Sequence, residues 1–207
     1  YKELGKIDKD VYRIAGAKNA VLKMMAAAVL TDEACRLTNV PQISDVRIMA
    51  GTMSDIGFDV KRTDGAAGEG VMEMRAAAAD WLFVPLEAAM KMRSSFILLG
   101  PLLTRFGRVI ISNPGGDRIG RRPVDLHVEA MHTLGAEIEY KNGYYFAEAP
   151  SGLRGAHIEF PYVTVMGTEN AMLAATLAKG TTVITNAAQE PEVDDLIAML
   201  RAMGAKI

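Results

Sequence analysis

The stretch Met131-His-Thr-Leu-Gly-Ala-Glu-Ile138 occurs twice more in related form, as Met53-Ser-Asp-Ile-Gly-Phe-Asp-Val60 and as Leu200-Arg-Ala-Met-Gly-Ala-Lys-Ile207. A β-rich phrase that ends in Ser/Thr-Asn lies upstream of each copy, and consecutive asparagines of these phrases are 74 and 73 residues apart. They are Asn39, Asn113 and Asn186. A regular period of this size indicates one supersecondary unit that is used repeatedly, and we expect one domain of three repeats at about 15–80, 85–160 and 161–207.

Each repeat contains two kinds of helix. One kind is apolar nearly all round, as is typical of a buried helix, and it is expected at 20–30, 94–103 and 171–178. Pro101 should kink or end the second of these helices. The other kind carries apolar residues at three- and four-residue spacing, which indicates an amphipathic helix. Its apolar positions are Val46, Met49, Met53 and Ile56 in the first repeat, Val124, Val128, Met131 and Leu134 in the second, and Val193, Leu196, Leu200 and Met203 in the third.

Alternating stretches follow the first two amphipathic helices, at 58–62 with 70–74 and at 136–140 with 144–148. The Lys141-Asn-Gly143 sequence between the latter pair is a hairpin turn signal. The repeat is therefore read as strand, helix, strand, helix, strand, strand. The sequence predicts an α/β (α+β) fold of three βαβαββ-type units, with the apolar helices inside and the amphipathic helices and sheets outside.

The composition is that of an ordinary globular protein. Half of the residues are hydrophobic and the formal net charge is -2, which argues against a nucleic-acid-binding surface spread over the whole chain. Cys35 is the single cysteine, so an internal disulfide is impossible and a reducing cytoplasm is favoured; we expect this thiol to be buried at the start of a strand. No signal peptide or membrane-spanning stretch is visible. The chain begins at Tyr1, so it is either processed or a piece of something longer.

The segment Pro114-Gly-Gly-Asp-Arg-Ile-Gly-Arg-Arg-Pro-Val-Asp-Leu-His127 differs from the other two repeats. The distance from the repeat asparagine to the glycine of the repeated phrase is 22 residues here, from Asn113 to Gly135, and 18 residues in the other two copies. The middle copy therefore has four extra residues, and they fall in this loop. Backbone N–H groups of a glycine-rich turn and guanidinium groups suit a phosphate-bearing ligand, and a proline that opens a helix would add a helix N-terminus. The other interpretation is a surface turn with solvated arginines.

On these residues the chain resembles the family of UDP-N-acetylglucosamine 1-carboxyvinyltransferases, the enolpyruvyl transferases of the first committed step of bacterial peptidoglycan synthesis. The matching phrases run through most of the chain in order. They are Gly16-Ala-Lys-Asn-Ala20, Met92-Arg-Ser-Ser95, Gly100-Pro-Leu-Leu-Thr-Arg-Phe-Gly107, Pro114–His127, Arg154-Gly-Ala-His157, Ala174-Ala-Thr-Leu-Ala178 and Glu190-Pro-Glu192. The resemblance implies transfer of the enolpyruvyl group of phosphoenolpyruvate to the 3-hydroxyl of UDP-N-acetylglucosamine, with release of phosphate.

Members of this family have two domains of three repeats each, built as inside-out α/β barrels, with the active site in the cleft between them. The chain resembles the first domain alone, and the second domain would supply a carboxylate base and further arginines. We therefore expect the isolated chain to be inactive and the full-length enzyme to be a bacterial cytoplasmic transferase. Its partners would be the two small-molecule substrates and the missing domain, without a cofactor, a metal, a nucleic acid or a membrane.

The resemblance also implies the site residues. Lys18 and Asn19 would meet phosphoenolpyruvate and the sugar nucleotide, Arg93 and Arg122 would contact ligand, and catalysis would involve Lys18, Arg122 and Asp117. Two stretches would line the nucleotide: Pro123, Val124, Asp125 and Leu126, and Tyr162, Val163, Thr164 and Val165. His127 lies in the motif and is given no chemistry. Without the resemblance, Lys18 and Asn19 would be interpreted as residues that begin a buried helix.

Two positions depart from the family pattern. Asp117 stands where most members have the cysteine that the epoxide antibiotic fosfomycin alkylates, so resistance to the drug is expected. Asp117 is also the best candidate for proton delivery, but neighbouring arginines favour its ionised form until bound phosphate neutralises them. The second departure is Met166-Gly-Thr-Glu-Asn170, where many members have Gly-Ala-Thr.

Two other functions remain open from the sequence. The sister enolpyruvyl transferase of the shikimate pathway shares the fold, but it would have a Gly-Ser-Lys-Ser type phrase in place of Gly16-Ala-Lys-Asn19. A non-catalytic module that binds a nucleotide sugar is the other alternative, since half of the family's site is absent.

Overall fold

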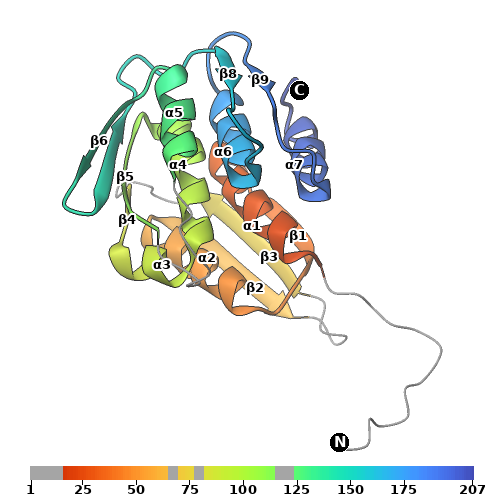
Figure 1. Cartoon of the computed structure of the whole chain (residues 1–207). Helices are drawn as coiled ribbons and strands as arrows, with labels where there is room; N and C mark the ends of the chain where they lie inside the picture. Colours follow the sequence, from red (N-terminus) through yellow and green to blue (C-terminus); the bar gives the residue numbers. More distant parts are fainter. Residues whose placement is uncertain (1–15, 65–69, 77–81, 115–123) are drawn as a thin grey trace, which may run out of the picture.

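The computed structural model of the protein describes residues 16–64, 70–76, 82–114 and 124–207. Within this part of the chain, five helices run side by side: α1 (Lys18–Ala27), α4 (Leu99–Phe106), α5 (Asp125–Thr133), α6 (Val165–Ala175) and α7 (Pro191–Ala202) (Figure 1). None of the helices in these ranges is both long and apolar enough to span a membrane.

The first sheet is antiparallel, with strand order β1-β3-β2. Its strands are β1 (Cys35–Val40), β2 (Phe58–Asp64) and β3 (Gly70–Ala76), and α2 (Ser44–Asp55) connects β1 to β2. The hydrophobic face of α2 is fully buried at Val46, Met49 and Met53, and Ile56 directly after the helix is buried too, as the apolar spacing predicted.

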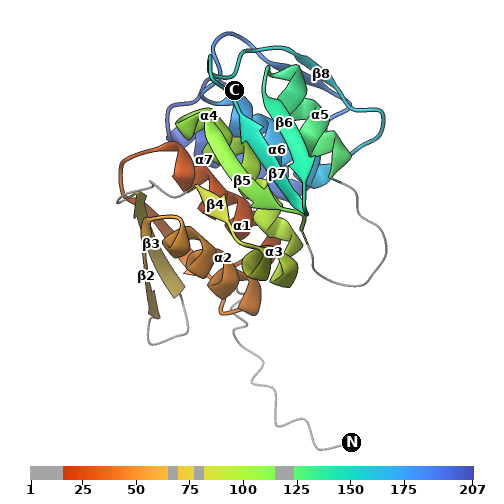
Figure 2. The same ribbon diagram turned by 90° about the vertical axis from the view of Figure 1, so that its left-hand side faces the viewer.

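The second sheet has the order β4-β5-β7-β6 and lies against one side of the helices (Figure 2). Its strands are β4 (Phe83–Val84), β5 (Arg108–Ser112), β6 (Glu137–Lys141) and β7 (Tyr144–Glu148). Asn142 and Gly143 both have positive φ, which a two-residue turn between twisted strands requires, so the predicted hairpin is confirmed. A third, parallel pair consists of β8 (His157–Glu159) and β9 (Val183–Thr185).

The apolar helices form the interior. α1 continues as the 3-10 helix η1 (Ala28–Leu30), and α6 packs against α1, α4, α5 and α7. Val21, Leu98 and Leu173, one from each apolar segment, are 6%, 0% and 0% exposed, so the predicted burial is confirmed. The mixed helix-and-sheet class is also confirmed. The strands of the described residues form three separate sheets and do not close into a barrel.

The glycine of the repeated phrase has the same backbone conformation in each copy. Gly57, Gly135 and Gly204 have φ of 101°, 96° and 101°, and each follows the end of an amphipathic helix. At the end of α7, the Ala205 N–H donates to the Leu200 carbonyl oxygen at 2.9 Å, as in a Schellman motif. The repeated phrase is therefore a helix-stop signal that needs a residue without a Cβ.

Two local predictions need correction. Pro101 does not end its helix, because it lies in the first turn of α4, where a missing N–H is tolerated, and α4 continues to Phe106. The helix expected at 94–103 is instead the 3-10 helix η2 (Arg93–Leu98) followed directly by α4, and the short helix α3 (Leu86–Lys91) precedes them. Cys35 begins β1 as expected but is only half-buried, and that burial, with the charge of Glu33, raises the pKa of its thiol.

Candidate active site

The first turn of α1 contacts the first turns of two other helices. Lys18, its first residue, is half-exposed and forms an ion pair with Asp45 in the first turn of α2. Asn19 follows, and its Nδ2 donates to Oε1 of Glu192 at 3.1 Å. Glu192 lies in the first turn of α7, so the N-terminal ends of α1, α2 and α7 meet around Lys18 and Asn19.

The start of α6 is tied to the segment that enters α7. The Thr164 hydroxyl caps α6 by accepting the Gly167 N–H at 3.4 Å. The Thr168 hydroxyl donates to the Thr164 carbonyl oxygen at 2.7 Å and accepts the Ala188 N–H at 3.0 Å. Because Ala188 lies just before α7, the N-terminal ends of α6 and α7 are neighbours.

An open groove of about 750 Å³ lies at these two helix ends. Its lining combines Val163, which precedes α6, with residues of β9 and of the connection from β9 to α7. The groove is lined by Val163, Ile184, Asn186, Ala187, Gln189, Glu190 and Pro191. Tyr162 and Val163 expose about half of their surface, at 53% and 54%, so two of the residues expected to line a nucleotide are accessible to a ligand.

The second expected nucleotide stretch is described from Val124 onward, at the start of α5. Val124 and Leu126 are buried in the hydrophobic core, whereas Asp125 is exposed. Only Asp125 presents its side chain to solvent here, and any ligand contact of the other two would have to come from their backbone. Three expected site residues, Asp117, Arg122 and Pro123, lie outside the described residues.

A buried hydrogen-bond network joins α5 to α6. The Gly100 N–H donates to Oδ1 of Asn170 at 2.7 Å, which fixes the orientation of that amide because a backbone N–H cannot accept. Asn170 Nδ2 therefore donates to the Phe96 carbonyl oxygen and to Nδ1 of His127, both at 3.0 Å. His127 accepts at Nδ1, so its neutral ring carries the proton on Nε2.

His127 is neutral at neutral pH. Its burial, and secondarily the positive charge of Arg93, lower its pKa from 6.5 to about 3. Arg93 begins η2 and is half-buried. Because the charge of Arg93 acts on His127, this arginine, which is expected to contact a ligand, lies close to the start of α5. The hydrogen bond from Asn170 and the burial of His127 give it a structural role, and the sequence had assigned it no chemistry.

One buried ion pair crosses between α1 and α6. Lys23 Nζ lies 2.9 Å from Oε1 of Glu169, and both residues are almost completely buried. The pKa of Glu169 is raised to about 7, chiefly by burial. The positive charge of Lys23 opposes this rise, and the negative charges of Glu192 and Glu190 add to it. These carboxylates belong to the same region as Asn19.

The arrangement is suited to anionic ligands. The first two turns of α1, α2, α5, α6 and α7 are connected through the contacts above, and the N-terminus of each helix carries a partial positive charge. Lys18 adds a positive charge beside these helix ends, which its ion pair with Asp45 offsets in this structure. Within the described ranges, no group of His, Cys, Asp and Glu is arranged to hold a metal ion.

Sequence reasoning missed several residues of this region, namely Lys23, Asp45, Glu169, Asn170 and Glu192 as partners of the expected site residues. A signal for three of them existed. Lys23, Glu169 and Asn170 are polar residues in helices that are otherwise apolar, and polar groups on a buried helix require partners.

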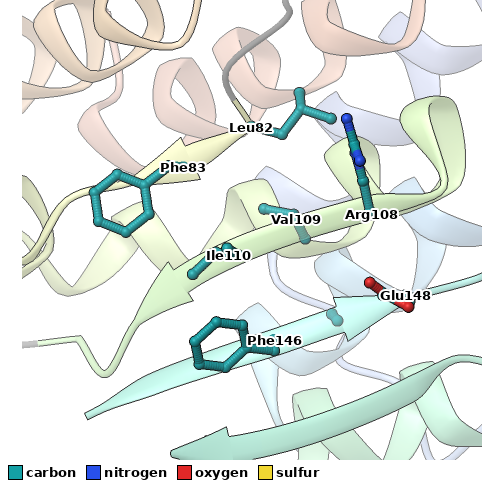
Figure 3. Close-up of a pocket in the computed structure, with 8 residues that line it drawn as sticks. Leu82, Phe83, Arg108, Val109, Ile110, Phe146 and Glu148 are labelled. Carbon is teal, nitrogen blue, oxygen red and sulfur yellow. The ribbon is translucent and has the colours of Figure 1, made fainter. Parts of the chain in front are cut away.

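A separate apolar cavity of about 280 Å³ lies on the second sheet (Figure 3). Ile110 pairs with Phe146 and Arg108 pairs with Glu148 across β5 and β7, and Phe83 of β4 extends the same surface. The cavity contains none of the residues that the sequence singled out for function.

Comparison with known proteins identifies the family. Residues 2–207 match the family described as EPSP synthase (3-phosphoshikimate 1-carboxyvinyltransferase). The UDP-N-acetylglucosamine 1-carboxyvinyltransferase of Caulobacter vibrioides is 48% identical over 194 residues, which are 94% of this chain and 45% of the relative. The enzyme of the same name from Paramagnetospirillum magneticum is 47% identical over 203 residues, 96% of this chain and 47% of the relative. The chain thus spans about half the length of these relatives.

Solved structures agree on the fold. The enolpyruvyl transferase NikO from Streptomyces tendae superposes with a TM-score of 0.79 at 21% identity, over 96% of this chain and 45% of that one. EPSP synthase from Acinetobacter baumannii gives a TM-score of 0.69 at 19% identity, over 94% of this chain and 44% of that one. Together with the match over residues 2–207, these likenesses establish that the chain belongs to the EPSP synthase family.

Proposed function

We propose that this chain is the N-terminal half of a UDP-N-acetylglucosamine 1-carboxyvinyltransferase. The full-length enzyme transfers the enolpyruvyl group from phosphoenolpyruvate to the 3-hydroxyl of UDP-N-acetylglucosamine and releases phosphate. This half binds the nucleotide sugar and part of phosphoenolpyruvate, and the other half completes the cleft. The reaction belongs to bacterial peptidoglycan synthesis in the cytoplasm.

The reaction is an addition followed by an elimination. The sugar hydroxyl attacks C2 of phosphoenolpyruvate and loses its proton to a base of the other half, while C3 gains a proton. That proton comes from Asp117 once bound phosphate neutralises the neighbouring arginines. Removal of a proton from C3 then expels phosphate and restores the double bond. Lys18, Arg93 and Arg122 stabilise the carboxylate and phosphate charges throughout.

One observation carries the proposal: the N-terminal ends of α1, α2 and α7 meet around Lys18 and Asn19, with the groove beside Val163 nearby. Helix N-termini favour anions, and both proposed substrates carry phosphate groups. The 48% identity to relatives of that name favours UDP-N-acetylglucosamine over the phosphorylated shikimate of the sister enzymes.

The test is an assay of phosphate release by the full-length protein, with phosphoenolpyruvate and either UDP-N-acetylglucosamine or 3-phosphoshikimate as the acceptor. We expect turnover with the nucleotide sugar only. Lys18→Met should lower kcat/KM by about 100-fold or more, because it removes a charge that faces the reacting anion. Arg36→Met, at an exposed position of β1, serves as the control and should leave the rate unchanged. Turnover with 3-phosphoshikimate alone would assign the chain to the sister activity, and ligand binding without turnover would favour a non-catalytic module.

A further inference from the structure

The two central apolar helices each carry one buried charge, and the charges form a pair. Lys23 of α1 is 4% exposed and Glu169 of α6 is 0% exposed. A buried ion pair loses hydration that its mutual attraction recovers only in part, so two apolar side chains would hold such helices together equally well or better. Stability alone therefore does not account for Lys23 and Glu169.

The pair adjoins the residues that meet at the start of α1. Asn19 and Lys23 are four residues apart and so lie on one face of α1. Asn19 is held by Glu192, and the negative charge of Glu192 acts on Glu169. A continuous set of contacts and charges thus runs from the ion pair to the Asn19 side chain.

The carboxylates of this region are only partly satisfied. Oε2 of Glu169 and Oε2 of Glu190 are buried and have no hydrogen-bond partner among the described residues. The charged groups that face Glu169 are Lys23 from α1 and Glu190 and Glu192 from the start of α7. One ammonium thus balances up to three carboxylates, so the charge next to Glu192 depends on whether Glu169 is ionised.

We propose that Lys23 and Glu169 are positioning residues of the candidate active site: their ion pair sets the charge beside Glu192 and thereby holds the Asn19 side chain in the geometry that substrate binding requires. Neither residue needs to touch a substrate. The inference rests on the proposed function for its kinetic consequence, but the position of Asn19 can be measured independently of turnover.

The experiment uses the full-length protein and two variants. Glu169→Gln keeps the size of the side chain and removes its charge, and Lys23→Met combined with Glu169→Leu replaces the pair by apolar groups. We expect the double variant to unfold at a temperature equal to or above that of the wild type. Both variants should lower kcat/KM for UDP-N-acetylglucosamine by about 10- to 100-fold, because a displaced binding group misaligns the substrate.

The direct readout is the side-chain amide signal of Asn19 in ¹⁵N-labelled protein, assigned with Asn19→Gln. In the wild type this signal should shift with a midpoint at the pKa of Glu169, about 7, and the kcat/KM profile should change in the same range. Glu169→Gln should abolish both changes. The matched control is Arg36→Met with Glu73→Leu, which removes an exposed pair whose Nε and Oε1 are 3.6 Å apart; it should alter neither readout.

The inference is overturned if the double variant keeps the kcat/KM, the pH profile and the Asn19 signal of the wild type. The ion pair would then serve only to pack α1 against α6. If the double variant does not fold, Glu169→Gln decides: an Asn19 signal that still titrates as in the wild type contradicts a positioning role. A wild-type protein that does not turn over the proposed substrates would remove the proposed function, and the Asn19 signal would still decide whether the pair positions that residue.

Discussion

Asn170 Nδ2 lies 3.0 Å from Nδ1 of His127, and this contact joins the second turn of α6 to the first turn of α5. The same amide also accepts from Gly100 and donates to Phe96. One side chain therefore connects α6 to η2, α4 and α5. The ring of Phe96 packs edge-on against His127, with centroids 5.4 Å apart, so the network is enclosed by apolar groups.

Replacement of Asn170 by leucine should destabilise the protein by about 2–4 kcal/mol, because the buried Gly100 N–H and Nδ1 of His127 would both lose the hydrogen bond that Asn170 gives them. Urea denaturation measures the change in the free energy of unfolding. Gln42→Leu, at an exposed position, is the control and should change stability by no more than about 0.5 kcal/mol. Equal stability of the Asn170 variant and the wild type would show that the network does not stabilise the fold.

Gly100→Ala should be destabilising by about 2 kcal/mol or more, because an added Cβ would overlap the side-chain and backbone oxygens of Asn170. Gly51 offers a matched control. It lies in α2 with open space around the position of a Cβ, so Gly51→Ala should stabilise the protein by about 0.5–1 kcal/mol. Thermal unfolding of the two variants should therefore give shifts of opposite sign. A Gly100→Ala variant that is as stable as the wild type would contradict the close packing of α4 on α6.

The low pKa of His127 predicts a loss of stability in acid. Its folded-state pKa is about 3 against an ordinary value of 6.5, so between these values the unfolded chain binds a proton that the folded protein does not. Stability from this residue is fully present above pH 6.5 and should fall by about 3 kcal/mol on acidification to about pH 4. Urea denaturation at both pH values measures this loss.

His127→Asn is the informative variant, because its side-chain oxygen can accept the bond from Asn170 but does not titrate. We expect this variant to lose most of the difference in stability between neutral and acidic pH. Glu169 titrates in the opposite sense: its raised pKa stabilises the fold below pH 4.5 and this contribution is lost as the pH rises through about 7. Because Glu169 is present in both proteins, its contribution cancels when the stability of His127→Asn is compared with that of the wild type at each pH. The exposed His157 provides a control, and His157→Gln should retain the wild-type acid sensitivity.

In the full-length enzyme, Asp117 should make the protein resistant to fosfomycin, because a carboxylate beside arginines is a much weaker nucleophile than a thiolate. Asp117→Cys should restore inactivation by the drug, seen as a mass shift, and preserve turnover. Asp117→Asn should lower the rate by about 100-fold or more if the residue delivers a proton. Covalent labelling of the wild type would contradict the predicted resistance. Normal turnover of the Asn variant would leave Asp117 without a role in proton transfer.

Much of the fold was predictable from local patterns. The repeated phrase marked the repeat, and the structure shows that its glycine ends each amphipathic helix, at Gly57, Gly135 and Gly204, since a left-handed residue after a helix strongly favours glycine. The apolar spacing of α2 predicted its buried face, and Asn142-Gly143 predicted a hairpin. These signals involve residues within a few positions of one another. The resemblance added Lys18, Asn19 and Arg93 as site residues, and their roles remain predictions.

The sequence by itself determined most of the helices, the hairpin at Asn142-Gly143 and the repeated phrases, because side-chain periodicity and turn chemistry act over short stretches of chain. Only the tertiary structure decided which polar residues of the buried helices are partners. Lys23 and Glu169 come from the first and third repeats, and Asn170 meets His127 from the second. Such pairs depend on how α1, α5 and α6 pack, and the raised pKa of Glu169 and the lowered pKa of His127 depend on the burial that this packing creates.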